Sequence, residues 1–406
     1  MSESRVKYVL LIVIGLGFAV SSADAQQNPR YEFSIIEEAG VPTALTTGGA
    51  KFEAPLFTFE KVLTLSSDPE NEESLLFRPG EFIRDEAGYF YVADTGNGRV
   101  AVFDPAGRYL RSFGREGGGP GEFQSLELQY LQGDVIHLCD PRGWRVTRFR
   151  TDGTLIDMTS LPRRPVMFSG LYFEPDDGTL LQVLRMEERG DEFASVWERV
   201  SILNSDRDEI AAIETPHGIS IAIKDGGRRS AAMYYAPQPQ VCVRPGLGCM
   251  LCNGDEPVIA WYDFSGRLLR RIRLELPVRP VTRQDEANVR ALEEERLVGA
   301  PPHIRESRLD LTLPENKAFW NDSQVDEAGW HWLVRYHDFD ARERGLGTTC
   351  LVVSPEGEYL GQCYLPASSG RVSHGHYLTF VTDEETEERL PTVYRIVPAV
   401  EGLIYP

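Results

Sequence analysis

A short turn that recurs six times along the chain constrains the fold more than any other feature. Each copy follows a run of β-branched or aromatic residues, and most copies end in Gly. Most are separated by about 45–60 residues, close to the ~40–50 residues of propeller blade repeats. The copies are residues 104–107, 150–153, 204–207, 263–266, 354–357 and 398–402. Repeated units bury their core against their neighbours, so a chain of 406 residues can fold without one large globular core.

The first complete unit spans residues 81–113. It contains four short runs of β-forming residues, separated by turns that carry Gly, Asp or Pro. The runs are residues 81–85, 89–94, 99–103 and 108–113. Four antiparallel strands make one propeller blade. Six such units predict an all-β fold, a six-bladed β-propeller.

The last unit is incomplete, because only four residues follow Gly402. Residues 59–65 form a spare segment with alternating apolar side chains ahead of the first complete unit. We expect this strand to pair with the last blade and close the ring, which removes two open sheet edges. The predicted propeller therefore spans residues 57–406, after an N-terminal extension at 26–56.

One interval between turns is longer than the others, from Gly266 to Gly357. Within it, residues 285–296 are rich in Glu, Arg, Ala and Leu, which favours a helix. Residues 278–316 are therefore predicted to be a helical insertion between blades four and five. We expect the insertion to cover a side or rim of the ring, where it could provide a second contact surface.

The N-terminus has the pattern of an export signal. Two cations in residues 1–7 precede the apolar run 9–20, and residues 23–25 form an A-x-A site. The apolar run is shorter than the roughly 20 residues that span a bilayer. We predict a signal peptide at 1–25, secretion or a periplasmic location, and no transmembrane segment after cleavage.

The net charge of −20 argues against nucleic acid as a partner, because nucleic-acid binding needs a cationic surface.

The six cysteines raise the prospect of disulfides in an exported chain. Cys350 and Cys363 flank one of the recurring turns almost symmetrically, so they could bridge two paired strands. Cys249 and Cys252 form a C-x-x-C near Cys242, where a local hairpin disulfide is favoured over a zinc or redox site. Cys139 is predicted to be a buried thiol.

Three segments resemble NHL repeats, and in particular the exported bacterial six-bladed β-propellers related to them. These segments are residues 77–80, 91–103 and the glycine-rich crossover 113–123. The resemblance implies the propeller fold. It leaves the activity open, because such propellers include protein, peptide and carbohydrate binders as well as lyases and lactonases.

In a propeller, all loops between second and third strands lie on one face. Aligning the units predicts a polar, ligand-binding basin on this face, where the channel opens. Its predicted residues are Arg78, Asp94, Asn97, Asp140, Arg142, Asn253, Asp255, Arg335, His337, Asp338 and Asp383. A sugar, a peptide or a Ca²⁺ ion would suit such a basin. The structural alternative is that an Asp at a strand end only caps the turn that follows it.

The favoured hypothesis is a binding module for an unknown protein, peptide or carbohydrate, with no cofactor unless Ca²⁺ sits at the channel mouth. The alternative is a metal-dependent hydrolase or lyase, lactonase-like or amidating-lyase-like. His374 and His376 are expected to lie at a turn, and the neighbours His337 and Asp338 are weak evidence for acid–base chemistry. A third hypothesis, an envelope scaffold, predicts an exposed apolar patch.

Overall fold

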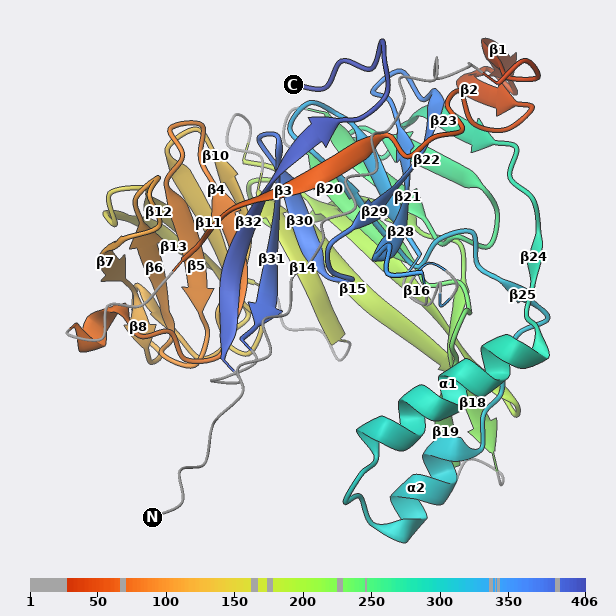
Figure 1. The fold of residues 1–406 in the computed structure, drawn as a ribbon. Helices are drawn as coiled ribbons and strands as arrows, with labels where there is room; N and C mark the ends of the chain where they lie inside the picture. The colour runs from red at the N-terminus through yellow and green to blue at the C-terminus, as the bar shows by residue number, and fades with distance from the viewer. Residues whose placement is uncertain are drawn as a thin grey trace, which may run out of the picture.

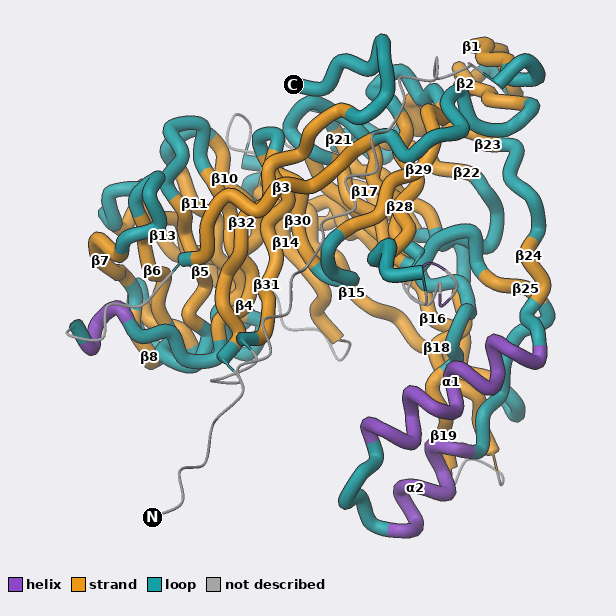
Figure 2. Tube along the Cα trace, in the orientation of Figure 1, coloured by secondary structure: helices purple, strands orange, loops and turns teal. Residues whose placement is uncertain are grey.

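The computed structural model describes residues 28–65, 71–161, 167–173, 178–224, 229–244, 247–335, 339, 341, 344–383 and 388–406. The predicted signal peptide, 1–25, lies outside them. Strands dominate the described residues, which also include two α-helices (Figures 1 and 2). In this part of the chain the strands form six sheets of four to six strands and two small two-stranded sheets. No helix of the described residues is long and apolar enough to cross a membrane.

The first two sheets each contain four antiparallel strands in sequence order. Sheet one consists of β4 (Pro79–Arg84), β5 (Phe90–Asp94), β6 (Arg99–Phe103) and β7 (Tyr109–Phe113). Sheet two consists of β10 (Glu127–Gln132), β11 (Val135–Asp140), β12 (Arg145–Arg150) and β13 (Leu155–Ser160). The short helix η1 (Glu72–Ser74) precedes sheet one. The crossover between the sheets holds the paired strands β8 (Arg115–Glu116) and β9 (Glu122–Phe123).

The third sheet is enlarged by strands that the sequence did not predict. It contains β14 (Met167–Phe173), β15 (Leu180–Arg189), β16 (Phe193–Leu203), β17 (Glu209–Glu214), β18 (Gly218–Lys224) and β19 (Arg229–Ala232). The long strand β16 pairs with β17 along its second half and with β18 along its first half. The β15–β16 hairpin therefore extends beyond the ring and carries β18 and β19 with it.

The fourth sheet gains two strands from the N-terminal extension. Its own strands are β20 (Gln240–Arg244), β21 (Gly248–Cys252), β22 (Val258–Tyr262) and β23 (Leu268–Leu274). The hairpin of β1 (Glu32–Glu38) and β2 (Val41–Thr47) adds to it, with β2 parallel to β23. The hairpin covers the outer edge of the sheet.

A helical hairpin follows β23. It consists of α1 (Arg283–Arg296) and α2 (Pro302–Leu309), between β24 (Arg279–Pro280) and β25 (Asn316–Lys317). Thr282 and Asp285 form a capping box that begins α1, which stabilises the first turn. Val289 of α1 is buried with Tyr234 and Tyr235, and α2 contacts β19. The helices and the extension of sheet three thus form one arm that projects from the ring (Figure 1).

Sheet five contains β26 (Asp322–Val325), β27 (His331–Val334), β28 (Thr348–Val353) and β29 (Tyr359–Leu365).

The sixth sheet combines both ends of the chain. Sheet six contains β30 (Gly370–Ser373), β31 (His376–Thr382), β32 (Arg389–Pro398) and β3 (Phe57–Thr64). β3 pairs antiparallel with β32, so the outermost strand of the last sheet comes from near the N-terminus (Figure 1).

The first strands of the sheets lie side by side around a channel. β4 contacts both β10 and β30, and β26 contacts both β20 and β30. Because β30 belongs to the last sheet and β4 to the first, the ring is closed. Apolar clusters fill the spaces between adjacent sheets, for example between sheets six and one. The molecule is a six-bladed β-propeller, and each of the six larger sheets is one blade.

Backbone geometry explains why the recurring turn could be recognised in the sequence. The closing glycines have φ between +79° and +98°, a region that side chains with a Cβ rarely adopt. They are Gly107, Gly153, Gly266, Gly357 and Gly402. Blade three has Arg207 at this position, with φ of 70°. The turn that follows the third strand therefore requires a positive φ, which glycine provides in five blades and Arg207 in blade three.

All six cysteines lie among the described residues, and all are free thiols. Cys350 and Cys363 face each other in the register of β28 and β29, but the predicted bridge between them is not formed. Cys249 packs into the core between blades three and four, and Cys252 into the core between blades four and five. The two side chains of the C-x-x-C therefore leave β21 on opposite faces, which rules out a shared site.

Candidate binding site in the central channel

Asp94 at the end of β5 is fully buried and holds the loops around it together. Its carboxylate accepts hydrogen bonds from the Phe77 backbone N–H (2.7 Å), Asn97 Nδ2 (2.8 Å) and Arg99 Nε (2.8 Å). These contacts join the loop before blade one to the loop after β5. The carboxylate therefore has a structural task, as the capping alternative anticipated.

Asp140 occupies the same position in blade two and makes the same kind of contacts. It accepts from the backbone N–H groups of Gln124, Ser125 and Gly143 at 2.9–3.0 Å. The guanidinium of Arg145 pairs with it at 2.8 Å, and the exposed fractions of the Arg and Asp side chains are 7% and 0%. Buried charges persist in proteins when they are paired and hydrogen-bonded in this way.

Two further predicted residues also form hydrogen bonds within the protein. Asn253 Nδ2 donates to the His217 carbonyl at 3.0 Å, and Arg335 Nε donates to the Phe319 carbonyl at 2.8 Å. Both side chains are buried. Arg335 thus fixes the loop that enters its own blade, as Asp94 and Asp140 do, whereas Asn253 binds the loop between β17 and β18 of blade three.

The other predicted residues lie on or near the loops of that face. Arg78, Asn97, Arg142 and Asp255 are exposed, and Asp383 is half-buried. His337 and Asp338 lie outside the described residues.

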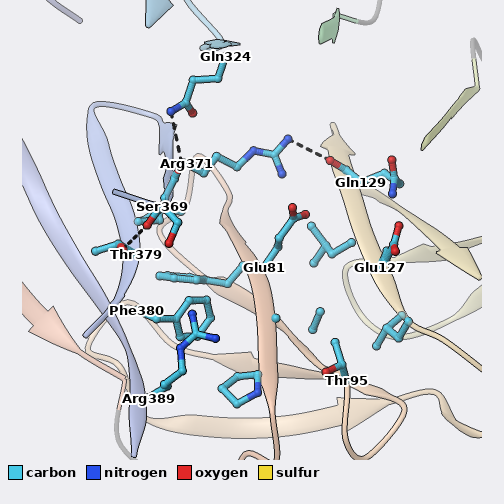
Figure 3. Close-up of a pocket in the computed structure, with 18 of the residues that line it drawn as sticks. Glu81, Thr95, Glu127, Gln129, Gln324, Ser369, Arg371, Thr379, Phe380 and Arg389 are labelled. Atoms are coloured by element: carbon cyan, nitrogen blue, oxygen red, sulfur yellow. Dashed lines mark hydrogen bonds between the residues drawn. The ribbon is translucent and has the colours of Figure 1, made fainter. Parts of the chain in front are cut away.

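A cavity of about 680 Å³ fills one end of the channel, where the first strands begin (Figure 3). Its walls come from the starts of β4, β10, β26 and β30, from four different blades. We call it the larger chamber. Its charged and amide-bearing side chains are Glu81, Glu127, Gln129, Asp322, Gln324, Arg371 and Arg389. The second strands end at this end of the ring, so the chamber opens on the predicted face, but none of the predicted residues is among those that line it.

Strand register shows that three acidic residues of the chamber occupy equivalent positions. Glu127 pairs with Cys139, the residue before Asp140, and Asp322 pairs with Val334, the residue before Arg335. Glu81 precedes Phe82, which pairs with Val92, two residues before Asp94. The first inward position of the first strand is thus acidic in blades one, two and five.

Arg371 crosses the channel. It starts on β30 of blade six, and its Nη2 donates to the Gln129 carbonyl of blade two at 3.0 Å (Figure 3). Gln324 fixes the start of β30, because it donates to the Gly370 carbonyl and accepts from the Val372 N–H. Arg371 and Gln324 also line a second cavity of about 230 Å³, together with Arg244 and Glu327. We call this the smaller chamber, and Arg371 separates the two.

The carboxylates of the larger chamber are in an unfavourable electrostatic setting. Water reaches Glu81 and Glu127, but the channel walls surround both and limit their hydration. Desolvation raises the pKa of Glu81, and Asp322 raises it further, against the attraction of Arg371. Desolvation also raises the pKa of Glu127, and repulsion from Glu81 and Asp140 adds to this effect.

A guanidinium lies at the mouth of the larger chamber. Arg389 of β32 stacks over the ring of Phe380, 5.0 Å from its centre (Figure 3). The chamber therefore offers carboxylates, guanidinium groups, amides and aromatic rings to a ligand.

Metal binding was the basis of the enzyme alternative. Among the described residues, no group of three or more His, Cys, Asp or Glu could hold a metal ion. His374 lies in the turn between β30 and β31, as expected, and His376 begins β31, with its ring in contact with the His374 carbonyl.

The sequence did not predict Glu81, Glu127, Gln129, Gln324, Arg371 or Arg389 as site residues. A signal was present for two of them, because Glu81 and Glu127 recur at the same position of successive repeats. In a first strand, such inward residues face the channel.

Comparison with known proteins supports the fold. Residues 70–186 match a family profile described as a 6-bladed beta-propeller, DUF5128. No curated protein matches the sequence.

Several solved structures resemble the chain at low sequence identity. A protein described as exported, from Bacteroides fragilis NCTC 9343, is 13% identical with a TM-score of 0.48, covering 84% of this chain and 94% of its own. A DUF4221 family member from Bacteroides vulgatus is 9% identical with a TM-score of 0.45, over 85% and 99%. A streptogramin B lyase is 9% identical with a TM-score of 0.41, over 83% and 97%.

Proposed function

We propose that the chain is an exported binding module that holds a polar ligand, a peptide or a carbohydrate, in the larger chamber of its central channel. The observation that carries this proposal is a contrast between two sets of polar residues. Asp94 and Asp140 are saturated by contacts that the fold itself requires. Within the described part of the chain, Glu81 and Glu127 have no hydrogen-bond or ion-pair partner, although they sit side by side in a cavity.

Carboxyl groups whose pKa is raised and that do not support the fold are typical of functional sites. The chamber also has a suitable size, since small-ligand sites are concave and measure about 300–1,000 Å³. Export is supported by the charged, apolar and A-x-A sequence of residues 1–25.

Saturation-transfer NMR on the mature chain tests the proposal, with a panel of short peptides and oligosaccharides. Two double variants separate the chamber from the surrounding face. Glu81→Gln with Glu127→Gln alters the chamber, and Arg142→Ala with Asp255→Ala alters exposed loops of the same face. We expect the first variant to weaken binding at least 10-fold and the second to leave it unchanged. The opposite pattern, or no binding by any probe, would overturn the proposal.

A further inference from the structure

We propose that the ligand of the larger chamber carries both a cationic nitrogen and a carboxylate, as amino acids and short peptides do. The nitrogen lies between Glu81 and Glu127, and the carboxylate lies against Arg371. This inference rests on the proposed function and adds the chemical class of the ligand.

The acidic end of the chamber provides the first half of the argument. Glu81 and Glu127 come from equivalent positions of adjacent first strands, and their side chains point into the same space (Figure 3). Two carboxylates without partners in a confined space repel each other, and a bound cation removes this repulsion. An ammonium group also offers three N–H donors, enough to hydrogen-bond both carboxylates at once.

The guanidinium that crosses the channel provides the second half. Arg371 contributes to both chambers, and among the described residues its one hydrogen bond goes to the Gln129 carbonyl. A guanidinium has five N–H donors in a planar fork that matches a carboxylate. Arg371 therefore keeps donors for a ligand while the Gln129 contact fixes its position.

The smaller chamber extends this basic layer. Arg244 lines it beside Arg371, and its Nε is buried without a partner in the described part of the chain. The acid of this chamber, Glu327, accepts from the Ser373 hydroxyl at 3.2 Å and the His374 N–H at 2.9 Å. Both carboxylate oxygens of Glu327 thus already accept hydrogen bonds from the protein. Along the channel, an acidic layer of Glu81 and Glu127 is therefore followed by a basic layer of Arg371 and Arg244.

A neutral sugar does not use this separation of charge, a polyamine uses only the acidic layer, and a simple carboxylate uses only Arg371. A short peptide with free termini uses both layers. Because both contacts are charged and partly exposed, binding should weaken as ionic strength rises.

Isothermal titration calorimetry on the mature chain at low salt tests the inference. The peptide probes are triglycine, N-acetyl-triglycine and triglycine amide, so that each charge is removed in turn. Spermidine, diglucosamine and cellobiose represent polyamines, amino sugars and neutral sugars. We expect triglycine to bind, and the acetylated and amidated forms to bind at least 10-fold more weakly.

Two variants assign each charge to its residue. Glu127→Gln should weaken triglycine at least 10-fold but leave N-acetyl-triglycine unchanged, and Arg371→Gln should weaken triglycine but leave triglycine amide unchanged. Arg371→Lys should restore part of the affinity. The exposed controls Glu116→Gln and Arg108→Gln should match the unaltered chain. Circular dichroism verifies that each variant is folded.

Three results would overturn the inference. They are equal affinity for triglycine and its acetylated or amidated form, equal effects of the two variants on all peptides, and no binding of any peptide. Binding of cellobiose or diglucosamine that is lost in Glu127→Gln would refute this inference while leaving the proposed function intact. Binding of spermidine alone would leave the acidic layer as the only recognition element and would also refute it.

Discussion

Replacing Asp140 by Ala should destabilise the propeller. The substitution removes a buried carboxylate that accepts three backbone N–H bonds and pairs with Arg145. Arg145 would remain with a side chain that is only 7% exposed and without its counter-charge. Removing one partner of a buried ion pair costs about 3–5 kcal/mol. We therefore expect the free energy of unfolding to fall by ~3–5 kcal/mol.

Asp134→Ala is the matched control in the same blade. Asp134 also pairs with an arginine, Arg150, but the two side chains are 60% and 51% exposed. Exposed ion pairs contribute about 0–1 kcal/mol, so this variant should remain close to the unaltered chain.

Reversible urea unfolding followed by circular dichroism measures both variants. The midpoint should shift for Asp140→Ala at an unchanged slope, because the slope reports the surface exposed on unfolding. A loss below about 1 kcal/mol for Asp140→Ala, as is typical of exposed pairs, would refute the structural role assigned to this carboxylate. Unaltered stability with lost ligand binding would return Asp140 to the binding site.

Three other substitutions test separate parts of the structure. Arg207→Gly should raise the free energy of unfolding by about 0.5–1 kcal/mol, because glycine adopts the positive φ of this turn without strain; an unchanged or lower urea midpoint would contradict this. Tyr405→Phe should lower it by about 1.5–3 kcal/mol, because the Tyr405 hydroxyl donates to the buried carboxylate of Asp326 at 2.7 Å; the exposed Tyr89→Phe is the control, and equal effects in calorimetry would count against the contact. Glu127→Gln should stabilise the ligand-free chain more at pH 7 than at pH 4. The raised pKa of Glu127 means that folding favours the protonated carboxyl. The stability that Glu127 contributes is therefore present below its pKa in the unfolded chain and is lost as the pH rises through its pKa in the folded chain. Thermal unfolding at both pH values measures the difference, and an equal effect at both would show that the raised pKa of Glu127 has no consequence for stability.

The blades could be predicted from the sequence because their turns impose a local requirement. A turn that needs positive φ favours glycine, and the positions of Gly107 and Gly153 therefore mark successive blades. The additions to blades three and four could not be predicted in the same way. Strands such as β2 and β18 add to sheet edges, and their partners, β23 and β16, are set by the folded ring rather than by a neighbouring turn.

The sequence predicted the face of the ring on which the candidate site lies, but not the residues that line it. Aspartates such as Asp94 and Asp140 stand out at strand ends, but they stand out because they cap loops. Glu81 and Glu127 recur at the same position of successive repeats, but only the closed ring shows that this position faces the channel. The contact between Arg371 and Gln129 joins blades six and two, residues 242 positions apart in sequence. No local pattern encodes such a contact.

The most direct test of the account is calorimetric titration of triglycine into three proteins: the unaltered mature chain, the chamber double variant Glu81→Gln with Glu127→Gln, and the loop double variant Arg142→Ala with Asp255→Ala. The account predicts binding to the unaltered chain and the loop variant, and at least 10-fold weaker binding to the chamber variant. Equal affinity in all three proteins, or loss in the loop variant alone, would place recognition outside the channel and contradict the account.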